Sequence, residues 1–261
     1  MKFSANLGFL WADRPLPDAI RAAKAAGFDA VECHWPYDIP AEETRSVLDE
    51  TGLAMLGLNT RRGDVEAGDN GLSALCHRRD EARAAIDEAL AYARVTGSSA
   101  VHVMAGKSRG TASRSAFVEN LAYACEQAKE ITILIEPLNP HNAPDYYLNS
   151  TGLAAEIIAE VRAPNLKMMF DCYHVQIIEG DVTRRLETLL PIIGHIQIAS
   201  VPDRSVPDHG ELDYSYVLER IHELGWNQPI GAEYLPDGGK EPDTLWIARH
   251  RRYLDKEHLD A

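Results

Sequence analysis

The segment ITILIEP at residues 131–137 is short, apolar and strand-like, and it ends in a glutamate where a loop begins. Three later segments repeat this design: LKMMFDCYH at 166–174, IGHIQIA at 193–199 and IGAEY at 230–234. Helical patterns follow these segments, which predicts four consecutive parallel strands. Parallel strands would bring Glu136, Asp171, Gln197 and Glu233 to one edge of the sheet. Three carboxylates at one edge repel one another unless a cation offsets their charge, so the pattern indicates a divalent metal site.

Strand-like and helix-like patterns alternate along the whole chain. We expect strands at residues 2–7, 30–33, 54–58, 100–104, 132–135, 167–170, 195–198 and 230–233. We expect helices at residues 17–26, 41–51, 78–96, 113–129, 151–161, 183–190, 214–224 and 242–256. Several helices end at a glycine, which suits the left-handed conformation of a helix C-terminus. Eight strand–helix units in about 250 residues is the count of a closed (β/α)8 TIM barrel.

An open, doubly wound sheet is the main structural alternative. That fold needs a glycine-rich phosphate turn after its first strand, and Asn6-Leu7-Gly8-Phe9 does not supply one. No linker or low-complexity segment divides the chain, so we expect residues 1–261 to form a single barrel domain. The longest loop, at about residues 59–77, contains three glycines and is predicted to be a mobile lid over the mouth of the barrel.

The net charge and the spacing of the cysteines limit which partners and which cellular compartment fit this chain. A net charge of −14 disfavours nucleic acid and anionic membrane surfaces as partners, because both require a basic face. The four cysteines are scattered without a C-x-x-C pair, which is typical of reduced thiols in a cytoplasmic protein. No apolar run reaches the roughly 18 residues that span a bilayer. We therefore expect a small molecule as the partner, and a homo-oligomer is compatible with the sequence.

Each of the four strand-end residues also has a simpler interpretation when taken alone. Glu136 and Glu233 suit a salt bridge or a solvent-facing position, and Asp171 suits a helix N-cap. Their recurrence at the same point of four successive units favours the metal site. Two glutamates, one aspartate and the amide of Gln197 form an all-oxygen ligand set, which suits Mg²⁺, Mn²⁺ or Co²⁺ better than Zn²⁺. We therefore predict one such ion as the cofactor.

Cations near the mouth are candidates for binding an anionic substrate. Lys107 follows the fourth expected strand, Arg204 follows the seventh, and Arg61 belongs to the expected lid. In an acidic protein such cations can capture an anion, although exposed cations are more often solvated surface groups. Arg61 and its lid neighbour Arg62 are weaker candidates for this role than Lys107 and Arg204.

Several histidines lie close to the expected site. His174, three residues past Asp171, is expected to hydrogen-bond a substrate oxygen, or else to have a structural role next to the site residues. His102 lies within a strand and is expected to be a hydrogen-bonded core residue. Glu32 and His34, at the end of the second strand, are weaker candidates for lining the pocket.

At these residues the chain resembles the hydroxypyruvate isomerase family, within the xylose-isomerase-like TIM barrel superfamily. The matching stretches are KFSANL, GFDAVECHWPYD, NTRRGDVEAGDNG, IEPLN, FDCYHVQIIEGD, GHIQIASVPDRSVPDHGELDY and GAEYLP. They span nearly the whole chain, and D-x-Y-H and H-I-Q-I-A are the most specific. The resemblance implies a divalent metal on Glu136, Asp171, Gln197 and Glu233, with the two glutamates also acting in acid–base catalysis.

Two departures bear on the substrate. Related ketose 3-epimerases have a histidine where Gln197 stands, which favours the hydroxypyruvate isomerase branch over the epimerases. In the lid, Thr60-Arg61-Arg62 stands where bacterial members have Leu-Pro-Ala, and relatives also isomerise four-carbon 2-oxo acids. The resemblance is thus more specific for the fold and the metal than for the substrate.

The activity that the resemblance implies is the interconversion of a small 2-oxo or hydroxy acid, foremost hydroxypyruvate and tartronate semialdehyde, through an enediolate. The metal would act as a Lewis acid, and the glutamates would move the proton. A 2-oxo-tetronate isomerase and a ketose 3-epimerase are alternatives with nearly the same site. A metal-dependent endonuclease-like hydrolase would need more strand-end histidines and a basic groove. A non-catalytic sugar-binding module would show no metal-dependent turnover.

Overall fold

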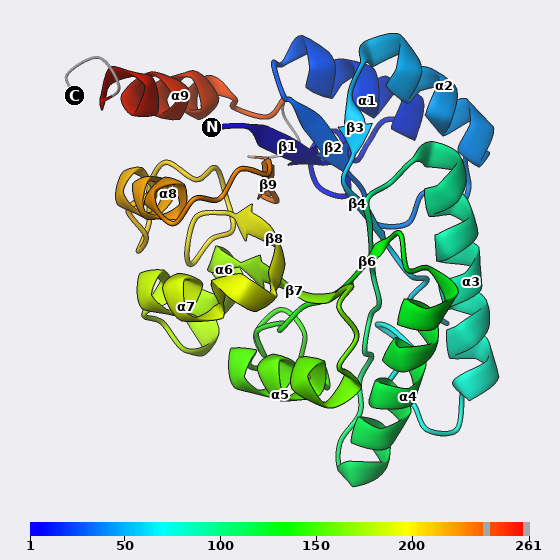
Figure 1. The fold of residues 1–261 in the computed structure, drawn as a ribbon. Coiled ribbons are helices and arrows are strands. Elements are labelled where there is room, and N and C mark those ends of the chain that lie inside the picture. The colour runs from blue at the N-terminus through cyan, green and yellow to red at the C-terminus, as the bar shows by residue number, and fades with distance from the viewer. Residues whose placement is uncertain (237–240, 258–261) are drawn as a thin grey trace.

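The strands form one parallel sheet that curves into a nearly closed barrel (Figure 1). The computed structural model describes residues 1–236 and 241–257. The strands are β1 (Phe3–Asn6), β2 (Ala30–Glu32), β3 (Ala54–Met55), β4 (Gly57–Asn59), β5 (Ala100–His102), β6 (Thr132–Ile135), β7 (Leu166–Asp171), β8 (Ile193–Ile198) and β9 (Ile230–Ala232). The helices are α1 (Leu16–Ala25), α2 (Ala41–Thr51), α3 (Arg79–Thr96), α4 (Thr111–Gln127), α5 (Thr151–Val161), α6 (Cys172–Ile178), α7 (Val182–Leu189), the 3-10 turn η1 (Leu190–Ile192), α8 (Tyr214–Glu223) and α9 (Leu245–Glu257). The predicted TIM barrel is confirmed.

The expected third strand is bent into two halves, β3 and β4, on either side of Leu56. Because β3 pairs with β2 and β4 pairs with β5, the order of neighbours is β3-β2-β1-β9-β8-β7-β6-β5-β4. Backbone hydrogen bonds cross the bend, since Leu56 N–H donates to Val31 O at 2.7 Å and Cys33 N–H donates to Gly57 O at 3.1 Å. The first and last strands, β1 and β9, pair in parallel and complete the ring.

The helices lie outside the ring of strands, and apolar side chains fill the space between the two layers (Figure 1). Phe3 of β1 is fully buried and meets Trp246 of α9 edge to face, with 4.9 Å between the ring centroids. This contact packs α9 against the first strand. Helices α2 and α3 end at Gly52 and Gly97 in the left-handed conformation, with φ of 67° and 73°, as predicted.

Two helices differ from the sequence-based prediction. Helix α6 was not predicted, and it follows β7 directly because Asp171 caps it: Asp171 Oδ1 accepts from Tyr173 N–H at 2.8 Å. His174 therefore lies in the first turn of a helix. Helix α9 begins at Leu245 instead of residue 242, because Asp243 Oδ1 accepts from Leu245 N–H at 2.9 Å and so marks the helix start.

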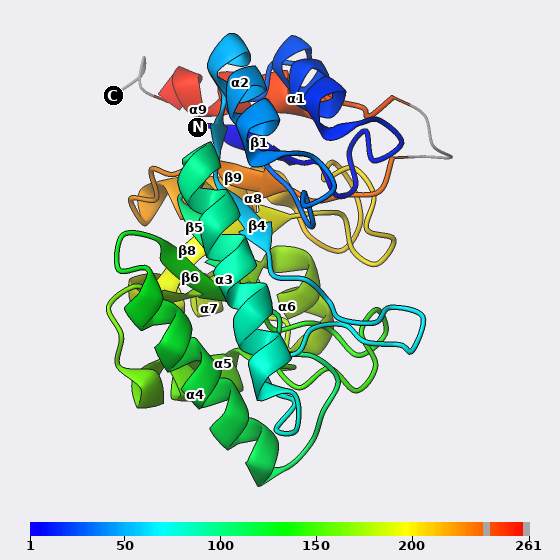
Figure 2. The ribbon, with the colours of Figure 1, turned by 90° about the vertical axis from the view of Figure 1, so that its right-hand side faces the viewer.

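The predicted lid is the loop between β4 and α3, which projects from the barrel (Figure 2). Its second half is fixed, because Gly71 forms an antiparallel bridge with Ala105 beyond β5. Gly71 has φ 111°, and a Cβ there would lie 2.7 Å from Gly106 N, so only glycine fits. Residues 63–67 at the tip of the loop are exposed. The closing motion of this loop stays a prediction.

Candidate active site and metal centre

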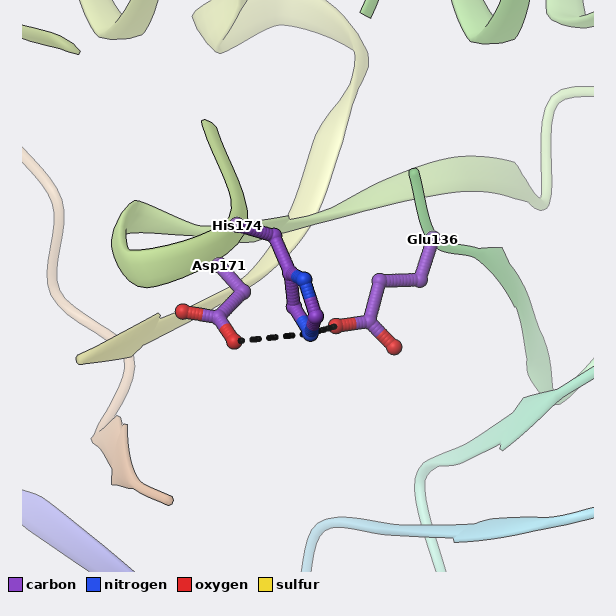
Figure 3. A group of neighbouring side chains, drawn as sticks. All are labelled: Glu136, Asp171 and His174. Carbon is purple, nitrogen blue, oxygen red and sulfur yellow. Dashed lines mark ion pairs between the residues drawn. The ribbon is translucent and has the colours of Figure 1, made fainter. Parts of the chain in front are cut away.

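The strand ends of β6 and β7 bring two carboxylates and an imidazole together. Ligating atoms of Glu136, Asp171 and His174 all lie within 4.8 Å of one another (Figure 3). Glu136 directly follows β6, Asp171 ends β7, and His174 reaches the same point from α6. All three side chains are buried, with 6%, 1% and 2% exposure respectively. The predicted convergence at this edge is therefore present for the two carboxylates.

Three of the four predicted ligands present an oxygen without a partner. Among the described residues, Glu136 Oε1, Asp171 Oδ2 and Gln197 Oε1 are buried and accept no hydrogen bond. Buried acceptors are almost always satisfied, and leaving one unpaired costs about 1–3 kcal/mol. Three such oxygens come from the ends of the neighbouring strands β6, β7 and β8. Carboxylate and amide oxygens are the donors that hard divalent cations prefer, so these residues fit such an ion.

The fourth predicted ligand, Glu233, is already paired on both oxygens. Its Oε1 accepts from Asn6 Nδ2 at 2.7 Å and lies 2.9 Å from His34 Nε2. Its Oε2 accepts from Arg204 Nη2 at 2.6 Å, and the same nitrogen lies 3.6 Å from Asp171 Oδ2. Arg204 thus links Glu233 to the carboxylates of the neighbouring strands and offsets part of their charge.

The environments of the two glutamates push their pKa values apart. Burial raises the pKa of Glu136 well above its ordinary value, and the charges of Glu233 and Asp171 add to this effect. Burial would also raise the pKa of Glu233, but Arg204 and then His34 outweigh it and hold that pKa at about 2. Burial raises the pKa of Asp171 to about 7 against the opposing charge of Arg204. Opposite pKa shifts on two neighbouring carboxylates are typical of sites that use carboxylates as acid and base.

Gln197 is oriented by a buried carboxylate below the site. Gln197 Nε2 donates to Glu32 Oε1 at 2.7 Å, which fixes the amide while its oxygen stays without a hydrogen bond. Glu32 also pairs with His195 Nε2 at 2.7 Å and accepts from Ser4 Oγ at 2.9 Å. A Cβ on Gly231 of β9 would lie 2.7 Å from Glu32 Oε1, so a glycine is needed where these side chains cross the barrel. Glu32, a weaker candidate from the sequence, therefore positions a predicted ligand.

We expect Glu32→Ala to lower the free energy of unfolding by about 3–5 kcal/mol, since it leaves a buried histidine and several buried donors without their acceptor. Reversible urea unfolding followed by circular dichroism measures this loss. The matched control is Glu66→Ala in the exposed tip of the lid loop, which should change stability by no more than about 0.5 kcal/mol. A loss below about 1 kcal/mol for Glu32→Ala would contradict a structural role for this network.

The hydrogen bonds of His174 fix which ring nitrogen carries the proton. Its Nδ1 accepts from the backbone N–H of Asn139 at 3.0 Å, and a backbone N–H can only donate. Burial lowers the pKa of His174 to about 3, so the ring is neutral and Nε2 bears the hydrogen. That nitrogen lies 3.7 Å from Asp171 Oδ2 and 4.0 Å from Glu136 Oε1. His174 is therefore placed to donate a hydrogen bond to a bound oxygen, which favours the predicted substrate contact over metal ligation.

Two cavities meet at these residues. A cavity of about 140 Å³ at the mouth is lined by Phe9, Trp35, His174, Arg204 and both catalytic candidates, Glu136 and Glu233. A second cavity, of about 340 Å³, lies inside the barrel and is lined by Glu32, His195, Gln197 and the same two glutamates. His102 lines both cavities. The expectation that His102 is a hydrogen-bonded core residue is wrong, because neither ring nitrogen makes a hydrogen bond within residues 1–236 and 241–257, although Nδ1 lies 3.7 Å from Glu136 Oε2.

The three predicted substrate-binding cations occupy different surroundings. Arg204 is mostly buried, with 12% of its side chain exposed; it lies over the rings of Phe9 and Tyr173 at 4.7 and 4.9 Å, and it lines the mouth. Arg61 instead binds Glu88 of α3, with Nε 2.7 Å from Oε2. Lys107 is exposed, and its Nζ would lie 3.7 Å from a Cβ on Gly68 of the lid loop. Of these three cations, only Arg204 contacts the strand-end carboxylates, Glu233 and Asp171. The substrate-binding roles of all three stay predictions.

Asn6 is a site residue that the sequence analysis missed. Its Nδ2 donates to Glu233 at 2.7 Å and to Glu32 at 3.2 Å, so it ties together the two carboxylates of β9 and β2. The signal that could have found it is its place at the end of β1, the same place that marked the predicted ligands. A neutral amide at a strand end drew less attention than a charge.

A parallel barrel with a buried carboxylate site at the C-terminal ends of its strands defines a TIM-barrel enzyme. The family model described as xylose isomerase-like TIM barrel matches residues 20–257, and the chain belongs to this family. None of the described helices has the length and apolar composition to span a membrane.

The chain is similar over nearly its whole length to isomerases. It is 43% identical to the 2-oxo-tetronate isomerase of Cupriavidus necator, over 94% of this chain and 97% of that protein. It is 34% identical to the hydroxypyruvate isomerase of Escherichia coli, over 96% of this chain and 100% of that protein. A crystal structure from Brucella melitensis, described as an AP endonuclease of family 2, superposes with a TM-score of 0.91 at 36% identity, covering 95% and 98% of the two chains. The predicted family and the predicted enzyme class, an isomerase, are confirmed.

Proposed function

We propose that this chain is a metal-dependent isomerase of a short 2-oxo acid with a hydroxyl group beside its carbonyl. Hydroxypyruvate and the four-carbon 2-oxo-tetronate are the substrates that the names of its relatives support. The observation that carries the metal dependence is the set of unpartnered buried oxygens on Glu136, Asp171 and Gln197, next to Glu233. An all-oxygen set with three carboxylates favours Mn²⁺, Mg²⁺ or Co²⁺ as the bound ion.

Isomerisation moves one proton between neighbouring carbons and exchanges the carbonyl with the hydroxyl, so it needs no outside oxidant. The four strand-end residues would hold the cation, which when bound supplies Lewis-acid polarisation of the carbonyl and acidifies the adjacent C–H. Glu136 and Glu233 both line the mouth cavity and are the carboxylates placed to remove and return the proton, through an enediolate. His174 offers Nε2–H to a substrate oxygen at the same point.

The size and charge of the site favour a small anion over a sugar or DNA. The mouth cavity of about 140 Å³ is smaller than the roughly 300–1,000 Å³ of sites for drug-sized ligands, which suits three or four carbons. Arg204 at the mouth offsets part of the negative charge of Glu233 and Asp171, which would otherwise repel the carboxylate of a substrate. A net charge of −14 disfavours a DNA substrate, despite the description of the Brucella structure as an endonuclease.

A substrate panel tests this proposal. We expect the Mn²⁺-loaded protein to turn over hydroxypyruvate or 2-oxo-tetronate with a kcat/KM at least ~10-fold above that for erythrulose or fructose, because a site that recognises a carboxylate loses that interaction with a neutral ketose. The reactions are run in D₂O, and deuterium incorporation at the carbon next to the carbonyl is followed by NMR. Faster turnover of the neutral ketoses would overturn the proposal in favour of a ketose epimerase.

A further inference from the structure

Most arginines near the mouth of the barrel are already neutralised by carboxylates. Arg61 pairs with Glu88, and its guanidinium lies over Tyr37 at 4.6 Å. Other pairs around the mouth are Arg78 with Asp69, Arg109 with Asp145, and Arg204 with Glu233. A guanidinium bound in this way has less attraction for a further anion, since its charge is offset and part of its donor edge is occupied.

Arg62 differs from these arginines. Its guanidinium lies 4.0 Å from the centre of the Trp35 ring, the side chain is half-buried, and no carboxylate pairs with it within the part of the chain that the structure describes. Trp35 lines the mouth cavity, and its Nε1–H donates to Thr60 O at 3.1 Å. The ring and the arginine are thus held by the same segment of the lid loop.

The backbone places Arg62 at the rim of the mouth. Its carbonyl accepts from Gly71 N–H at 2.8 Å, beside Asn70, which also lines the cavity. A guanidinium held over the face of an indole can still donate its N–H groups to an anion, and the contact limits the freedom of a long side chain. The guanidinium of Arg62 is thus held in position with N–H groups that can donate to both oxygens of a carboxylate. The rest of the protein repels anions, because its net charge is −14.

We infer that Arg62, stacked on Trp35, is a specificity-determining residue that captures the carboxylate of the substrate at the rim of the mouth. This inference rests on the proposed function and deepens it, because it assigns acid recognition to the lid. It also separates the two adjacent arginines of the loop: Arg62 lies over Trp35, whose ring lines the mouth cavity, whereas Arg61 is held on α3.

The test compares Arg62→Gln with Arg79→Gln, which removes the same charge from an exposed arginine of α3 that pairs with Glu119. For the 2-oxo acid that the wild type turns over best, we expect Arg62→Gln to raise KM at least about tenfold with kcat changed less than about twofold. Arg79→Gln should stay within about twofold of wild type in both constants. Arg62→Lys, which keeps the charge but loses the planar fork, should fall between wild type and Arg62→Gln. The KM for erythrulose should be the same in all four proteins.

Each outcome is decisive for one of the two claims. If the wild type turns over no 2-oxo acid, the proposed function fails. If it does, and Arg62→Gln keeps a wild-type KM or loses affinity for the acid and for erythrulose alike, the inference about Arg62 is overturned while the proposed function stands. Circular dichroism and the thermal midpoint of Arg62→Gln confirm that the variant is folded before the constants are compared.

Discussion

Exhaustive removal of divalent metal should abolish isomerase activity, and Mn²⁺, Co²⁺ or Mg²⁺ should restore it. The physical reason lies in Glu136 Oε1, Asp171 Oδ2 and Gln197 Oε1, three buried oxygens that no donor satisfies. A bound cation would pair with them and provide the Lewis acid that proton removal from carbon requires. The measurement is turnover of the 2-oxo acid after dialysis against a chelator, followed by titration with each metal.

A second readout separates metal binding from catalysis. Asp171→Asn keeps the side-chain shape but removes one ligand charge, so Mn²⁺ should bind at least ~10-fold more weakly, as measured by electron paramagnetic resonance of free Mn²⁺. Asp203→Asn is a suitable control, because this half-exposed aspartate bonds Ser205 and His209 away from the strand ends. Full activity in protein shown by elemental analysis to contain no metal would contradict the proposal.

The position of the carboxylates could be predicted because it depends on topology alone. In a parallel barrel every strand delivers its last residue to the same edge, so a polar residue after an apolar run locates Glu136 or Asp171 without knowledge of packing. The simpler interpretation of Asp171 is also correct, since Oδ1 caps α6 while Oδ2 faces the site. One carboxylate performs both roles, and a sequence pattern cannot show that they coexist.

The surroundings of the cations could not be predicted, because they depend on contacts between loops far apart in the sequence. Arg204 was expected to overhang the mouth as a free cation, but its backbone adopts φ 54° and its side chain turns inward to Glu233. Arg61 and Arg62 are neighbours in the sequence, and only the fold shows that one contacts α3 and the other Trp35. The partnerless His102 likewise depends on a cavity inside the barrel.

Glu136→Gln and Glu233→Gln should each lower kcat by at least ~10²-fold, because each removes a ligand charge and a proton carrier. Both residues line the mouth cavity, where their carboxylates can reach a bound substrate. The measurement is kcat for the 2-oxo acid with Mn²⁺ in saturating excess, so that weaker metal binding is not mistaken for a loss of catalysis.

The double variant distinguishes one shared function from two separate ones. If both glutamates serve a single proton transfer, the two losses should not multiply, and the double variant should be about as slow as the slower single variant. The control is Glu211→Gln, on an exposed loop residue that contacts Gln176 and not the strand ends; it should leave kcat unchanged. A Glu136 or Glu233 variant that binds metal and keeps near-normal turnover would reduce that glutamate to a structural ligand, and the other carboxylate would then both remove and return the proton.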